Sequence, residues 1–240
     1  MKYARMLEGR HALVLGGASR IGRAVALLFA EHGAEVTAAD EVSGETERIF
    51  NEMAGASPDI KLFTLDFTSE CIKRIRDSAL TEFPRADILV SAADLYKTGE
   101  THNFCLKDFR RMLDVNFIRA VRCFQALLPG MLENRRGELI LIAPDLTDSA
   151  LPGTAAAAAC AGAMAAFARN VTMDYIRYHV RANTILYPFI PGREPLTGAP
   201  EPLDAANAAL WYACDLSRFV IGESLSVNGG VSYFEEAPSS

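Results

Sequence analysis

Positive charge is scarce in this chain. Its 240 residues include 24 Lys and Arg against 30 Asp and Glu, which gives a net charge of −6 and a pI near 5.3. With no basic stripe to neutralise phosphates, nucleic acid is excluded as a partner. Long apolar runs are missing too: none approaches the roughly 20 residues of a membrane span, and residues 1–10 are too mixed and charged for a secretion signal. We therefore expect a cytoplasmic protein with no membrane partner.

Cysteine, histidine and lysine are also few. The five cysteines are odd in number, widely spaced and set in apolar surroundings, which indicates buried, reduced thiols rather than a disulfide framework. The four histidines show no metal-ligand spacing, so we expect no metal site. No lysine follows Lys107. A site built from the second half of the chain therefore has no ammonium side chain available to it.

What the chain has is enough apolar sequence for one sizeable core, with 50% hydrophobic residues and a mean hydropathy of +0.10. Short apolar runs alternate with helix-length segments, the first of them a helix over 21–32 that Gly33 closes. We expect strands at 11–16, 35–40, 61–65, 88–92, 139–142, 182–186 and 224–227. This βαβα order predicts an α/β fold of Rossmann type, a doubly wound parallel sheet of about seven strands with helices on both faces. It forms a single domain over 1–240, with a folded core at 6–234 and a polar tail at 235–240.

A glycine-rich turn joins the first strand to the first helix. Glycines at 16 and 22 allow a tight turn and a close approach to a pyrophosphate at a helix N-terminus. Asp40 ends the second strand, where a carboxylate accepts hydrogen bonds from an adenosine ribose, which favours NAD over NADP. Asp66 follows the third strand on the same edge. Alternatively, Asp40 and Asp66 are ordinary solvated strand ends.

These features, with others in order along the chain, resemble the short-chain dehydrogenase/reductase family. The further landmarks are Asp87–Val90, Asp114–Asn116, Pro129–Met131, Gly137–Ile140, Arg181–Asn183 and Gly222–Gly230. The resemblance implies that the cofactor-binding positions are Gly16, Ser19, Arg20, Ile21, Gly22, Asp40, Asp66 and Ala92. Arg20 stands where the middle glycine of the turn usually lies, and it either touches a phosphate or fills the turn.

The resemblance also implies a catalytic set of Asn, Ser, Tyr and Lys, in which the lysine ammonium lowers the pKa of the tyrosine hydroxyl. Only the asparagine, Asn116, is retained. The serine position falls on Pro144, or on Ala143 if the register slips by one, and the Tyr and Lys positions fall on Ala157 and Ala161. Since no lysine follows Lys107, no shift of register restores the set.

Neighbouring residues offer a weaker alternative. Tyr175 and Tyr178 lie beyond the expected site, and His179 could replace the lysine. A tyrosine without a cation keeps a pKa near 10. We therefore expect no intact catalytic residue.

Three further departures fall on the same cleft. Asp94 stands where the family has a glycine beside the cofactor, which adds charge and bulk. Phe189 follows Pro188 where the family has glycine, and its ring would project toward the nicotinamide pocket. The stretch from Pro188 to the helix at Ala205 is roughly fifteen residues shorter than a full substrate lid. We expect NAD binding to be weak or vestigial.

The segment 154–167 predicts a helix of almost exclusively small side chains. In the family this helix packs against its counterpart in another subunit. We expect Phe117, Phe124, Leu127 and Leu128 to complete that interface. The alternative is a helix buried inside its own domain.

The resemblance and its losses leave three functions open. The first is a non-catalytic subunit that supports an active NAD-dependent alcohol or hydroxyacyl-CoA dehydrogenase paralogue in a heterotetramer. The family includes such assemblies, among them one that oxidises a hydroxybenzylsuccinyl-CoA thioester. A homo-oligomer is the alternative assembly. The second function is a weak oxidoreductase that uses Asn116 with Asp94, Asp145 or a bound water. The third is a sensor that binds NAD without reacting.

Overall fold

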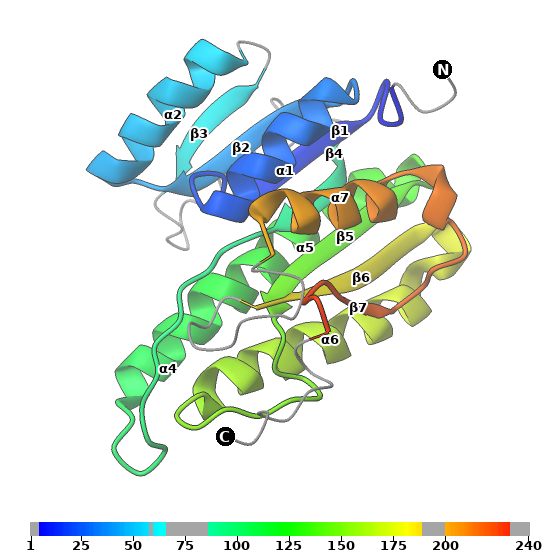
Figure 1. Cartoon of the computed structure of the whole chain (residues 1–240). Coiled ribbons are helices and arrows are strands. Elements are labelled where there is room, and N and C mark those ends of the chain that lie inside the picture. Colours follow the sequence, from blue (N-terminus) through cyan, green and yellow to red (C-terminus); the bar gives the residue numbers. More distant parts are fainter. Residues whose placement is uncertain (1–4, 58–59, 66–85, 189–199, 231–240) are drawn as a thin grey trace.

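Seven parallel strands form one sheet, as predicted, and their order is β3-β2-β1-β4-β5-β6-β7 (Figure 1). The structure is a computed structural model, and it describes residues 5–57, 60–65, 86–188 and 200–230. The strands are β1 (His11–Leu15), β2 (Glu35–Glu41), β3 (Lys61–Leu65), β4 (Ala86–Ser91), β5 (Gly137–Pro144), β6 (Val180–Tyr187) and β7 (Ser224–Ser226). Each lies within two residues of its expected bounds at either end. The tail at 235–240 lies outside the described residues.

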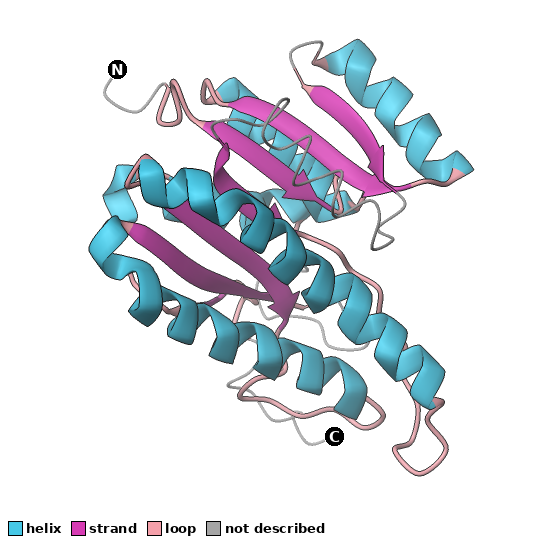
Figure 2. Ribbon diagram, turned by 180° about the vertical axis from the view of Figure 1, so that it is seen from behind, coloured by secondary structure: helices cyan, strands magenta, loops and turns pink. Residues whose placement is uncertain are grey.

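Helices cover both faces of the sheet (Figures 1 and 2). They are α1 (Arg20–Glu31), α2 (Gly44–Ala56), α4 (Leu106–Leu113), α5 (Arg119–Glu133), α6 (Ala155–Tyr175) and α7 (Pro202–Ala213). Short turns of other pitch are η1 (Asp114–Ile118), η2 (Ile176–Tyr178) and η3 (Asp215–Ser217). Helices α1, α2 and α7 contribute buried side chains to the cluster on one face, while α5 and α6 contribute to the cluster on the other.

The inner faces of these helices follow from apolar spacing. In α1 the side chains of Ile21, Val25 and Phe29 recur every four residues and are at most 3% exposed. In α5, Phe124 and Leu127 are 2% and 5% exposed and pack in the cluster that holds strands β4 and β5. They therefore face their own core, and the prediction that they complete a subunit interface is wrong.

Cysteine burial follows the prediction in part. Cys160 and Cys214 are free and buried, as expected, but Cys105 is exposed because it is the residue before α4. Cys71 lies outside the described residues. Among the described residues no group of His, Cys, Asp and Glu could hold a metal ion. Within the same ranges, every helix is too short or too polar to cross a bilayer.

A buried ion pair lies at the starting edge of β5 and β6. Arg181 approaches Glu138 Oε1 at 2.5 Å through Nη2 and at 2.8 Å through Nε. The same guanidinium donates to the carbonyls of Val220 and Tyr212 at 2.9 and 3.2 Å. Burial raises the pKa of Glu138, and the adjacent Arg181 opposes that shift. Through Arg181, the ion pair therefore links the first residues of β5 and β6 to the end of α7 and the chain that follows it.

The strand order reverses between β1 and β4, which follow each other in space but not in sequence. In an open parallel sheet, such a switch point leaves a crevice at the carboxyl ends of the strands, and ligands bind there. Residues 16–22, 42–46 and 92–95 follow β1, β2 and β4 at this edge, and Asp40 and Glu41 end β2 there.

Candidate functional site

The glycine turn after β1 is required by the packing of the chain itself. Gly16 has φ +73°, and a Cβ there would lie 2.7 Å from the backbone of Ala92. A Cβ at Gly22 would lie 2.0 Å from the carbonyl oxygen of Gly16. Both distances are far below van der Waals contact, so neither position accepts a side chain without a shift of backbone. The fold alone therefore accounts for both glycines, whether or not a cofactor binds.

Ser19 fixes the start of α1. Its hydroxyl oxygen accepts a hydrogen bond from the Gly22 N–H at 3.0 Å, which caps the helix. The same hydroxyl donates to the carbonyl of Ala92 at 2.9 Å. Ser19 and the Ala92 carbonyl, both predicted to contact the cofactor, thus bind each other.

Asp40 holds the turn against the end of β2. Its two carboxylate oxygens accept hydrogen bonds from the N–H groups of Ala18 at 2.9 Å and Glu41 at 2.7 Å. Burial raises the pKa of Asp40, and the two N–H donors oppose that shift. Each oxygen retains a second lone pair for a further donor. Asp40 therefore lies at the end of β2 and lines the cavity, and the hydrogen bonds that its carboxylate accepts come from backbone N–H groups of the chain itself.

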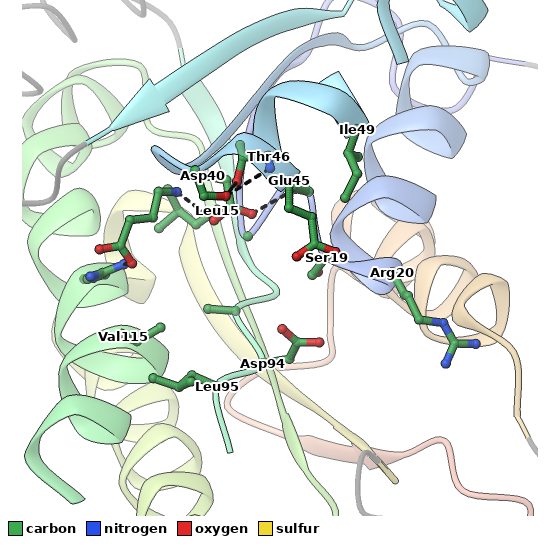
Figure 3. Close-up of a pocket in the computed structure, with 16 residues that line it drawn as sticks. Leu15, Ser19, Arg20, Asp40, Glu45, Thr46, Ile49, Asp94, Leu95 and Val115 are labelled. Carbon is green, nitrogen blue, oxygen red and sulfur yellow. Dashed lines mark hydrogen bonds and ion pairs between the residues drawn. The ribbon is translucent and has the colours of Figure 1, made fainter. Parts of the chain in front are cut away.

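A cavity of about 420 Å³ lies at the switch point (Figure 3). Its lining residues are Leu15, Gly16, Ala18, Ser19, Arg20, Asp40, Glu41, Ser43, Glu45, Thr46, Ile49, Ala93, Asp94, Leu95, Val115 and Arg119. Among the predicted cofactor positions, Gly16, Ser19, Arg20 and Asp40 line it. Ile21, Gly22 and Ala92 are buried behind its wall. Asp66 lies outside the described residues.

Among the charged residues that line this cavity, acidic side chains outnumber basic ones. Carboxylates come from Asp40, Glu41, Glu45 and Asp94, whereas the cations are Arg20 and Arg119. The guanidinium of Arg119 already forms ion pairs, since its Nη1 lies 3.2 Å from Glu41 and its Nε 3.5 Å from Asp114. Arg20 is exposed, and Figure 3 shows its guanidinium directed away from Asp40.

Asp94 reaches into the cavity from the segment after β4, and Figure 3 shows its carboxylate pointing toward Ser19. Burial raises the pKa of Asp94, the charge of Asp40 adds to that shift, and Arg20 opposes it. By surface area Asp94 is nonetheless exposed, and its carboxylate adds negative charge to this side of the cavity.

The start of α2 completes the cavity, and it was not among the predicted site residues. Ser43 precedes the helix, and its hydroxyl oxygen accepts a hydrogen bond from the Thr46 N–H at 3.0 Å. Glu45 lies in the first turn, where negative charge is favoured. A serine followed by acidic residues just after a strand is a helix-start signal, so these neighbours of Asp40 could have been found from the sequence.

Asn116 lies in the π-helical turn η1 between α4 and α5. It is fully buried, its Nδ2 donates to the Leu95 carbonyl at 2.7 Å and its Oδ1 accepts from the Leu95 N–H at 3.0 Å. The wide turn brings the amide against the chain after β4. The retained asparagine therefore clamps the segment that carries Asp94.

The other three positions of the implied catalytic set are buried and apolar. Pro144 ends β5, while Ala157 and Ala161 are 1% and 0% exposed on the inner face of α6. Ala157 packs in a cluster with Met112 and Cys160. No hydroxyl or amine is present at these positions, and none of the three lines the cavity.

Tyr96 brings a hydroxyl near this cluster, which sequence reasoning did not consider. Its ring packs against the cluster that contains Ala157 and Cys160. Burial raises the pKa of Tyr96 well above 10, and Cys160 and Asp94 add to that shift. A tyrosine that exchanges protons with substrate near neutral pH needs the opposite shift. The direction of this shift therefore gives no support to Tyr96 as a replacement for the tyrosine that the resemblance implies.

Tyr175, Tyr178 and His179 lie at the wrong edge of the sheet. His179 directly precedes Val180, which pairs with Gly137 at the start of β5, whereas Pro144 is at the other end of that strand. At about 3.3 Å per residue, the strand separates the two edges by roughly 20 Å. The alternative in which His179 replaces the lysine is thereby excluded.

The shortened lid and Phe189 lie outside the described residues. The two ends that flank this stretch are joined, because the Tyr187 hydroxyl donates to the carbonyl of Pro200 at 2.6 Å.

Solved structures of related proteins share this architecture. A 3-oxoacyl-(acyl-carrier protein) reductase with bound NAD from Brucella melitensis has a TM-score of 0.84 and 23% identity, over 97% of this chain and 94% of that one. A short-chain dehydrogenase/reductase from Burkholderia xenovorans has a TM-score of 0.86 and 26% identity, over 96% and 99%.

Curated sequences match over a similar length. The 3-oxoacyl-(acyl-carrier-protein) reductase of Thermotoga maritima is 24% identical over 94% of this chain and 98% of its own. The mitochondrial borneol dehydrogenase of Lavandula x intermedia is 29% identical over 97% and 94%. The short chain dehydrogenase family matches residues 10–192. With that match, the seven-stranded sheet and the glycine turn at its switch point, this chain belongs to the short-chain dehydrogenase family.

Proposed function

We propose that this chain is a non-catalytic member of the family, which assembles with an active NAD-dependent paralogue and supports its structure. The observation that carries the proposal is the inner face of α6. There lie Ala157 and Ala161, the positions that the family resemblance assigns to the proton-transferring pair, and both are buried in apolar clusters. Without a positioned acid and base, hydride transfer loses about 10²- to 10⁴-fold in rate.

The nicotinamide cofactor fits this chain in one half only. The glycine turn, the carboxylate of Asp40 and the cavity all lie on the side of β1 and β2. Asp94 opposes a pyrophosphate, and the cavity does not extend to Pro144 or α6. We therefore derive no step of hydride transfer for this chain.

The outer face of α6 supports the assembly part of the proposal. Ala155, Ala159, Gly162 and Ala166 are exposed there, spaced three or four residues apart. A Cβ added at Gly162 would meet nothing within 4 Å. Small residues let a second helix approach closely. A paralogue with the same fold presents the equivalent helix, so its α6 is the partner element that we propose, in a heterotetramer.

Beside this face, Phe117 extends the apolar surface toward α5. Its ring meets that of Phe167 edge to face, with centroids 5.3 Å apart, and both are half-buried. Leu128 is half-buried as well. Of the four residues expected to flank the interface, Phe117 and Leu128 thus remain candidates.

Activity tests the catalytic half of the proposal. The purified chain is incubated with NAD and a panel of alcohols and hydroxyacyl-CoA thioesters, and NADH formation is recorded. We expect no turnover above the rate without protein. Turnover above that rate would refute the non-catalytic half of the proposal and establish the chain as a divergent oxidoreductase instead.

Assembly is tested separately in the native source. Native mass spectrometry of the tagged chain should show a hetero-oligomer with an active family member, and a lone homo-oligomer would refute the proposal. Gly162→Leu should release the partner. Gly55→Leu is the matched control, because Gly55 is also an exposed helical glycine with nothing within 4 Å of its Cβ position, but it lies on α2.

A further inference from the structure

Residues 92–105 connect β4 to α4 without forming a helix or a strand. Figure 1 shows this segment running beside α4 and bending back where that helix begins. Connections that exceed roughly 12–15 residues are uncommon in compact domains and usually have a function, and this one reaches that length. The segment therefore indicates a role beyond joining two elements.

The part of this segment at 95–104, here called the strap, is held against α4 and the turn η1. Its first residue, Leu95, exchanges two hydrogen bonds with the buried amide of Asn116. Farther along, the Lys97 ammonium lies 2.9 Å from the Asp108 carboxylate on α4. The strap is thus fixed at two points along the same helical stretch.

The middle of the strap is bound to the loop that precedes α6. The Gly99 N–H donates to the Gly153 carbonyl at 2.9 Å. Gly153 has φ +75°, and a Cβ there would lie 3.3 Å from the Gly99 nitrogen. Both the close approach and the left-handed backbone favour glycine at this contact. Because β4 and β5 are neighbours in the sheet, the contact joins the chain that follows one strand to the chain that follows the other.

A small hydrophobic cluster, separate from the two main ones, lies beneath the strap. Its buried members are Met112, Leu146, Ala156, Ala157 and Cys160. Tyr96 and Phe104 pack against them from the strap. Such satellite clusters are typical beneath long loops. The Tyr96 ring is half-buried and its hydroxyl oxygen is buried, so this side chain points inward.

The strap accounts for the limit of the cavity at the switch point. In an open parallel sheet, the crevice for ligands lies outside the carboxyl ends of the strands. Among the described residues, the cavity is lined as far as Leu95 but by no residue of β5 or α6. The next residue, Tyr96, already packs against the cluster that contains Ala157 on α6. The crevice is therefore open beside β1 and β2, and the strap covers it beside the start of α6.

We propose that the strap is an intramolecular plug that keeps ligands from the start of α6, and that Tyr96 is the side chain that fills this half of the crevice. The plug is a steric barrier, added to the loss of catalytic side chains and independent of the assembly proposed above. A small phenol has the shape and the polarity to take the place of the Tyr96 side chain.

Thiol labelling of the purified full chain tests this closure, because the chain carries its own reporters. Cys105 is exposed at the end of the segment, Cys160 is 0% exposed beneath the strap, and Cys123 is 1% exposed in the cluster beside α5. The rate of maleimide labelling at each cysteine is read by mass spectrometry after digestion. We expect Cys105 to react fast and the other two slowly. A Cys160 that reacts as fast as Cys105 would overturn the proposal.

The variant Tyr96→Ala removes the plug. We expect it to speed the labelling of Cys160 about tenfold or more and to leave Cys123 within about twofold, since only the strap is loosened. Tyr96→Phe keeps the ring and should keep Cys160 protected. No acceleration at Cys160, or an equal acceleration at Cys123, would refute the role of Tyr96.

Phenol tests whether the space left by the side chain accepts a ligand. At millimolar concentration it should restore the protection of Cys160 in Tyr96→Ala, because an apolar cavity binds an aromatic molecule of matching shape. Cys105 in the same sample controls for any effect of phenol on the labelling reaction. Unrestored labelling of Cys160 would refute a space of ligand size.

The glycine contact provides an independent variant. Gly153→Ala places a Cβ 3.3 Å from the Gly99 nitrogen and should also speed the labelling of Cys160. Gly9→Ala is the matched control, since Gly9 has φ +71° but nothing within 4 Å of its Cβ position. Equal effects of the two variants would show that backbone strain, not the strap, is responsible. None of these measurements involves NAD, turnover or a partner, so failure here is distinguishable from failure of the proposed function.

Discussion

Replacing Asn116 by alanine tests whether this residue is retained for structure rather than for chemistry. The change deletes the amide that donates to the Leu95 carbonyl at 2.7 Å and accepts from the Leu95 N–H at 3.0 Å. Two backbone groups then lose their partner, and each unsatisfied buried group costs about 1–3 kcal/mol. Because Leu95 is only half-buried, water reaches these groups in part. We expect the free energy of unfolding to fall by about 2–4 kcal/mol.

Urea unfolding followed by circular dichroism measures this loss as a lower midpoint at an unchanged slope. In a chain of this size 1 kcal/mol corresponds to about 2–4 °C, so the Tm should fall by roughly 4–16 °C. Gln125→Ala, exposed on α5, is the control and should change stability by less than about 0.5 kcal/mol. A loss below about 1 kcal/mol in Asn116→Ala would refute the clamping role.

Three further changes probe other parts of the structure. Gly22→Ala places a Cβ 2.0 Å from the carbonyl of Gly16 and should cost about 3 kcal/mol or more in urea unfolding, without any cofactor present. Arg181→Met leaves the buried Glu138 carboxylate without its partner and should cost about 3–5 kcal/mol, again by urea unfolding. The folded-state pKa of Asp94 is raised above 3.8, so its ionisation opposes folding as pH rises through that pKa. Asp94→Asn should therefore raise the Tm at neutral pH and leave it unchanged well below pH 3.8, in thermal scans across this range.

Each of these has its own control. Gly55→Ala, in open space, should stabilise by up to about 1 kcal/mol, and an equal response at Gly22 would show that the turn tolerates a side chain. Adding Glu138→Leu to Arg181→Met should recover most of the loss, since no buried charge is then unpaired. A Tm gain in Asp94→Asn that persists below pH 3.8 would show that packing, not charge, is responsible.

The sheet could be predicted from sequence because its strands are buried on both faces. Residues 139–142 are a continuous apolar run, and residues 182–186 are apolar except for Asn183 and Thr184; the two stretches lie in the middle of β5 and β6. The ends were harder: β5 begins at Gly137 and continues to Pro144, because pairing with β6 extends past the apolar run. Local composition therefore predicts the central residues of a strand, but not how far its pairing with the neighbouring strand extends.

The site was predictable only where local chemistry decides it. Asp40 and the glycine turn were found because strand ends and tight turns constrain nearby residues. The π-helical turn at Asn116 has no local signal, since its register depends on the contact with Leu95, 21 residues earlier. Likewise, the inward orientation of Phe124 follows from how α5 lies on the sheet. From the sequence alone, Phe124 could face either the core or a partner subunit.

Under the proposed function, the methyl-lined inner face of α6 resists a return of the catalytic side chains that the resemblance implies. Ala157 is 1% exposed among Met112, Leu146 and Cys160, so a tyrosine ring there displaces neighbours that now fill the space. A lysine at Ala161 would bury an ammonium in an apolar cluster. We expect each of these single substitutions to destabilise the fold. Under the proposed function, the packing of this helix therefore favours retention of the scaffold over recovery of the catalytic side chains.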